Sequence, residues 1–117
     1  LLHGLEGLAS PTQFSLGTLV SCIAWSAEAG ALMVEAHYQG IVLSFGMAMF
    51  ILAALNLAIA IPISVANLGT FEASIIFALQ RLDIPFDKAL AIATFHHAMQ
   101  LAGVSLMALV TWIFFRK

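Results

Sequence analysis

The stretch that decides the fold is IAIPISVANLGTFEASIIFALQ, Ile59 to Gln80. It is largely apolar, yet Pro62, Asn67, Gly69 and Glu72 all fall within eleven residues. Proline removes a backbone donor and clashes with the preceding turn, whereas glycine permits a positive φ. The stretch therefore predicts two helical pieces joined by a break, with an ionisable carboxylate just after the break.

The composition around this stretch is that of a membrane protein. The chain has 117 residues, of which 62% are hydrophobic and 9% are charged, whereas about a quarter of the residues of a soluble domain carry charge. Four basic residues cannot form the patch that nucleic acid requires. The single cysteine, Cys22, excludes an internal disulfide and a cysteine-based metal cluster. Neither a metal site nor a cofactor is predicted.

Segment lengths give the predicted organisation, because a spanning helix needs about 20 mostly apolar residues. The segments are a loop or the end of a preceding helix at 1–13, a spanning helix at 14–38, a spanning helix at 41–61, the break at 62–69, a short helix at 70–82, a loop at 83–87 and a spanning helix at 88–115. Ser10-Pro11 is typical of a helix start. The predicted fold is an all-α polytopic membrane domain with about three spanning helices and one short half-helix.

The short helix has two possible arrangements. It either dips into the membrane as a re-entrant half-helix or forms a broken pair with the helix before it. Irregular backbone is tolerated at membrane depth only where protein or a cavity shelters it, so we expect the break to be buried in protein. Two basic residues lie on each side of the last span, so orientation stays open. A first residue other than Met suggests a C-terminal piece that packs against missing N-terminal helices of the same protein.

Glu72 is the first candidate for a functional residue. If Gly69 is the N-cap of the short helix, Glu72 lies at the third helical position and can accept from free backbone N–H groups. Capping is one interpretation of this acid. A polar site at membrane depth, with Pro62 and Asn67 also on the break, is the other. A carboxylate there suits an ammonium group or a proton rather than a phosphate.

The last span supplies three more polar candidates. His96 and Gln100 are four residues apart and share a helix face, whereas the adjacent His97 points elsewhere. Interhelical hydrogen bonding is one role for them, and proton relay or headgroup contact is the other. Glu28 and Glu35 are seven apart on one face of the 14–38 helix. Glu28 is expected deep in the membrane, and Glu35 near the interface.

The segment IPISVANLGTFEASIIFALQRLDIPFDKALAIATFHHAMQLAGVSLMAL resembles the C-terminal part of the lysylphosphatidylglycerol synthase transmembrane family, also called UPF0104. The matching positions are Pro62, Gly69, Glu72, Ala89 and His97. Further upstream, SCIAWSAEAGALMVEAHYQGI resembles the family's preceding helix. The resemblance implies a multi-pass protein of the cytoplasmic membrane of a bacterium or archaeon. It also implies a phospholipid or polyprenyl-linked lipid as partner.

Three functions remain open at the level of sequence. The first is translocation or handling of a modified phospholipid or lipid-linked headgroup, with the break, Glu72, His96, His97 and Glu28 lining its path. The second is the membrane half of a lipid-modifying enzyme, for aminoacyl or glycosyl transfer. No catalytic constellation is visible in this segment, so an enzyme is not the primary expectation. The third is a passive membrane scaffold.

Overall fold

The computed structural model describes residues 10–61 and 63–116, which are helical throughout apart from short connections. The helices are α2 (Pro11–Tyr38), α3 (Phe45–Ile59), the 3₁₀ turn η2 (Val65–Asn67), α4 (Thr70–Gln80) and α5 (Phe86–Phe115). Within the described ranges there is no β-strand. The predicted all-α fold is confirmed.

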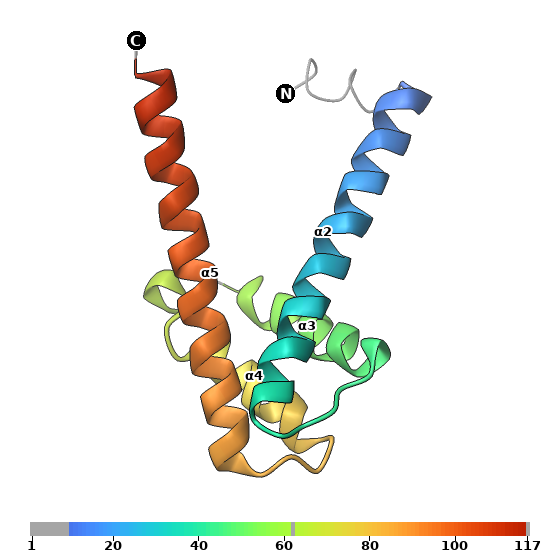
Figure 1. Ribbon diagram of the computed structural model, residues 1–117, viewed down its shortest axis with the longest axis vertical. Coiled ribbons are helices and arrows are strands. Elements are labelled where there is room, and N and C mark those ends of the chain that lie inside the picture. The colour runs from blue at the N-terminus through green and yellow to red at the C-terminus, as the bar shows by residue number, and fades with distance from the viewer. Residues whose placement is uncertain (1–9, 62, 117) are drawn as a thin grey trace.

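The two long helices, α2 and α5, form a V that opens toward both ends of the chain (Figure 1). With 28 and 30 residues they measure about 42 and 45 Å at ~1.5 Å per residue. Both are long and apolar enough to cross a membrane. α2 begins at Pro11 behind the N-cap Ser10, so the predicted helix start is confirmed.

Toward the closed end of the V, α3 passes behind α2 and α4 lies between the two arms, and the two helices form a hairpin (Figure 1). α3 packs against α4, α4 packs against α5, and α2 packs against both α3 and α5. The hairpin begins and ends near the closed end of the V, and its turn lies partway up the arms (Figure 1). The structure thus has the broken helix pair that the sequence offered as one of two arrangements.

The hairpin helices are too short to cross a bilayer. α3 has 15 residues and α4 has 11, so they measure about 22 and 16 Å, against ~30 Å of hydrocarbon. The helix predicted at 41–61 is therefore shorter than expected. Residues 41–44 run into it as a non-helical connection, and Ser44 caps its start by accepting from the N–H of Met47 at 3.2 Å.

The break itself differs from the prediction in one respect. Pro62 lies outside the described residues, but several of its neighbours do not have the protein cover that we expected. Ile61, Ile63, Val65 and Leu68 are all exposed. These side chains are apolar, so lipid or protein outside the described ranges has to cover them, because no described helix does.

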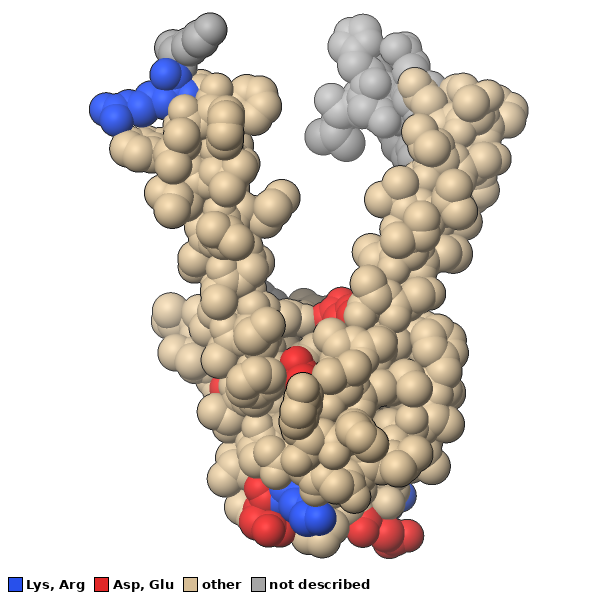
Figure 2. Space-filling model, viewed as in Figure 1, with Lys and Arg blue, Asp and Glu red and all other residues tan. Residues whose placement is uncertain are grey.

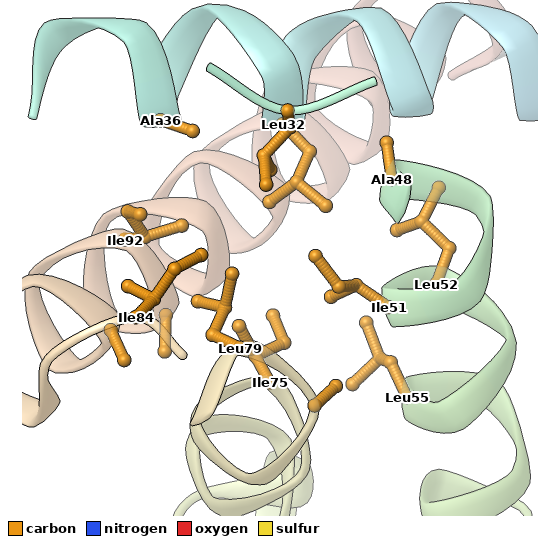
Figure 3. Packing of buried hydrophobic residues seen from close by; sticks show 14 of the residues in the cluster. Leu32, Ala36, Ala48, Ile51, Leu52, Leu55, Ile75, Leu79, Ile84 and Ile92 are labelled. Atoms are coloured by element: carbon orange, nitrogen blue, oxygen red, sulfur yellow. The ribbon is translucent and has the colours of Figure 1, made fainter. Parts of the chain in front are cut away.

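The hydrophobic core lies at the closed end of the V (Figure 3). α2 contributes Leu32 and Ala36, while α3 and α4 contribute branched aliphatic side chains that face them. The remaining labelled members of the cluster are Ala48, Ile51, Leu52, Leu55, Ile75, Leu79, Ile84 and Ile92. This core holds the hairpin between the two long helices and so fixes the position of the residues at its turn.

In the part of the chain that the structure describes, the charged side chains visible in Figure 2 lie at three levels of the molecule. Acidic and basic atoms gather at the closed end of the V, basic atoms mark the far end of α5, and a few acidic atoms lie between them (Figure 2). At the far end, the Arg116 guanidinium lies 4.5 Å from the centroid of the Trp112 ring. An apolar band bounded by charges and an aromatic residue is typical of a membrane-embedded helix.

Candidate functional site

The acidic atoms in the middle of the molecule belong to a cluster of carboxylates and histidines. Glu28 and Glu35 come from α2, Glu72 comes from α4, and His96 and His97 come from α5. His96 lies eight residues after Lys88 along α5, which is a rise of about 12 Å. The cluster therefore lies well inside the apolar band rather than at its charged end.

The first part of the cluster joins α2 to α5. The Nδ1 atom of His96 lies 2.8 Å from Glu35 Oε2, and its Nε2 atom lies 3.7 Å from Glu28 Oε1. The amide of Gln100 donates to the same Glu28 oxygen. His96 is 2% exposed and Glu35 is 8% exposed, whereas the side chain of Glu28 is 35% exposed. Glu28 is therefore the member of this group that a ligand can reach.

The burial of Glu35 was not predicted from the sequence. The residue lies near the end of α2, and its carboxylate is buried against His96. α5 crosses α2 so that the one imidazole faces both Glu28 and Glu35. The seven-residue spacing of these acids was the available signal, because it already placed them on one helix face.

The second part of the cluster joins the hairpin to α5. Glu72 Oε1 lies 2.7 Å from His97 Nδ1, and Glu72 Oε2 accepts from the backbone N–H of Gly69 at 2.8 Å. The ring of His97 stacks on Phe71 with centroids 4.2 Å apart. The predicted capping of the short helix by Glu72 is confirmed, and the same carboxylate also ties α4 to α5.

The backbone at the turn of the hairpin explains why glycine precedes α4. Gly69 has φ +85°, and Ala66 and Asn67 have φ values of +51° and +56°. An L side chain rarely adopts such conformations, and each costs of order 1–3 kcal/mol. Asn67 is half-buried and belongs to neither group of paired side chains.

A groove opens beside the first group, between α2, α3 and α5, with a volume of about 690 Å³. Its polar lining comes from Glu28, Glu35, Asn56, His96 and Gln100. Apolar residues of α3 and of the second half of α5 form the rest: Leu55, Ile59, Met99, Val104 and Met107. Glu72 and His97 lie next to this groove but do not line it. The sequence did not predict the roles of Glu35, Asn56 and Phe71.

Buried carboxylates are costly unless they are paired. Within residues 1–80 the sequence has no lysine or arginine, so the histidines and Gln100 are the partners these acids find. With all three carboxylates ionised and both imidazoles protonated, the cluster would carry one negative charge in excess, which would suit a cationic group.

A family model for the lysylphosphatidylglycerol synthase TM region matches residues 2–108. No curated protein gives a significant match to the chain, and neither does a solved structure. The family match covers the α2 helix, the hairpin and most of α5, which are the elements that carry the site. The chain belongs to the lysylphosphatidylglycerol synthase transmembrane-region family and is an integral membrane protein.

Proposed function

We propose that this domain binds the headgroup of a modified phospholipid or lipid-linked substrate in the groove beside Glu28 and moves it across the cytoplasmic membrane of a bacterium or archaeon. The observation that supports this most directly is a reachable carboxylate within the apolar band. Glu28 lies at the groove, is oriented by Gln100, and has His96 behind it.

The groove suits a lipid because its two ends differ in polarity. Glu28, Asn56, His96 and Gln100 offer hydrogen bonds at one level, while Met99, Val104 and Met107 offer apolar contact along α5. A headgroup can exchange water for these polar partners while its acyl chains stay against apolar side chains. The excess of carboxylates favours a headgroup that carries an ammonium group.

In the proposed arrangement, the α3–α4 hairpin determines how deep the site lies in the membrane. In the proposed arrangement, α2 and α5 span the bilayer and α3–α4 enters from one side and returns to it. Discontinuous helices of this kind bring backbone and polar side chains to membrane depth in many transporters. The hairpin turn, with Gly69 and Glu72 at its end, then lies beside the route that the headgroup follows.

Transbilayer movement of an ammonium-bearing lipid by the full-length protein in liposomes tests the proposal, with outer-leaflet amine labelling as the readout. We expect Glu28→Gln to slow movement at least about tenfold, because a hydrogen bond to a charged partner contributes ~1.5–3 kcal/mol. Asp87→Asn is the matched control, since Asp87 is exposed at the start of α5. Equal rates for Glu28→Gln and wild type would reject the role of the groove.

One observation favours the second candidate function, a lipid-modifying enzyme. Glu35 and His96 form a carboxylate–imidazole pair, which is the arrangement that orients a general base. Mass spectrometry of the lipids after incubation separates the two functions. Translocation leaves the mass of the lipid unchanged, whereas aminoacyl or glycosyl transfer changes it by the mass of the transferred group.

A further inference from the structure

His96 is placed differently from its neighbour His97, although each uses Nδ1 to meet a carboxylate. His97 faces one acid, Glu72, and its ring is covered by Phe71. His96 lies between two acids, with Glu35 at one ring nitrogen and Glu28 at the other. Its Nε2 atom is buried and has no hydrogen-bond partner within the described part of the chain.

The protonation of His96 follows from these two contacts. If Glu35 is ionised, its carboxylate accepts, and the contact then places a proton on Nδ1 of His96. In the neutral ring, Nε2 then presents a lone pair to a Glu28 oxygen 3.7 Å away. Two acceptors that face each other repel. A second proton on the ring turns Nε2 into a donor and the repulsion into attraction.

The titratable and aromatic groups around His96 come from three of the four packed helices. α2 contributes Glu28 and Glu35, and α4 contributes Phe71, whose neighbour Glu72 is paired with His97. α5 contributes His97 and the uncharged Gln100, and α3 has no titratable side chain. No lysine or arginine occurs before Arg81 in the sequence. Within the described residues, the two acids that contact His96 form no ion pair with a lysine or arginine.

We infer that Glu28, His96 and Glu35 hold one exchangeable proton between Glu28 and the His96 ring, and that a cationic headgroup binding at Glu28 displaces it. This inference rests on the proposed function. The buried Nε2 atom leaves space for a proton but not for a larger ligand, whereas Glu28 is open to the groove. The ammonium group brings one positive charge to the cluster and the displaced proton removes one, so the net charge of the cluster does not change.

The proposed exchange fixes the direction in which headgroup affinity changes with pH. Because a proton on His96 and an ammonium group at Glu28 compete for the same carboxylates, each weakens the binding of the other by the same factor. Headgroup affinity therefore rises with pH, as the proton shared by His96 and Glu28 is lost. Across a membrane, the leaflet at lower pH releases the headgroup, so a proton gradient drives movement of lipid toward the acidic side.

Proton release on binding tests the exchange in the full-length protein, purified in detergent. The probe is dihexanoyl phosphatidylethanolamine, which carries an ammonium group, and dihexanoyl phosphatidylglycerol is the control without one. We expect about one proton released per bound phosphatidylethanolamine at a pH where Nε2 of His96 carries its proton, measured by calorimetry in buffers of different ionisation enthalpy. His96→Gln should release none, and His37→Gln, at an exposed position, should behave as wild type.

A second variant keeps the test sharp if His96→Gln fails to fold. Glu35→Gln retains Glu28 and a hydrogen-bond acceptor for His96 but lowers the affinity of the ring for its proton, so release should shift to lower pH. Phosphatidylethanolamine binding without proton release in wild type overturns the exchange and leaves the proposed function standing. Absence of lipid movement by wild type in the liposome assay contradicts the proposed function itself.

Discussion

At the scale of single residues, the arrangement depends on which carboxylate meets which imidazole. Helical spacing predicted that His96 and Gln100 share a face and that Gly69 and Glu72 cap α4, and both are seen. Pairing across helices was not predictable, because spacing along one helix contains no information on how two helices cross. For this reason the contact between Glu35 and His96 was not predicted.

The Glu72–His97 pair should stabilise the attachment of the hairpin to α5. Removing either partner leaves the other half-buried or buried without its hydrogen bond. A double-mutant cycle of Glu72→Ala and His97→Ala should give a coupling energy of about 1–2 kcal/mol, measured by unfolding in detergent. Ser15→Ala, which removes an exposed bond within α2, should stay within ~0.5 kcal/mol of wild type. Additive effects of the two variants would contradict the pairing.

At the scale of elements, the sequence predicted the position of the break but not the length of the helix before it. Proline, asparagine and glycine mark residues 62–69 as non-helical on local grounds. The start of α3 at Phe45 depends on the Ser44 cap and on Gly40, which has φ +73°. Both residues lie in or beside an apolar run that hydropathy alone assigns to a spanning helix.

Any side chain at Gly69 should destabilise the protein, because the backbone there has a positive φ. A Cβ atom added there would meet nothing within 4 Å, but φ is +85°. Gly69→Ala should therefore lower the free energy of unfolding by about 1–3 kcal/mol. Gly17→Ala is the control, because Gly17 is helical with equally open space and alanine favours a helix by ~0.5–1 kcal/mol. Thermal unfolding of both variants in one detergent compares them, and equal effects would exclude the backbone explanation.

At the scale of the whole molecule, the central claim is that α3–α4 enters the membrane and returns on one side, which places the carboxylate–histidine cluster at depth. The closed end of the V supports this arrangement. A Cβ atom on Gly40 would lie 3.8 Å from Lys88 Nζ, so the connection before α3 meets the start of α5. A chain in which α3 crossed the bilayer and α4 did not return would instead place these two segments on opposite faces.

The most direct test is the sidedness of single cysteines in the full-length protein, in a Cys22→Ser background, read with a membrane-impermeant thiol reagent. Gln39→Cys lies before the hairpin, Asp83→Cys lies after it, and Arg116→Cys lies at the far end of α5. We expect residues 39 and 83 to react from the same side of the membrane and residue 116 to react from the opposite side. Reaction of residues 39 and 83 from opposite sides would show that α3 crosses the bilayer and α4 does not return, and would contradict the account.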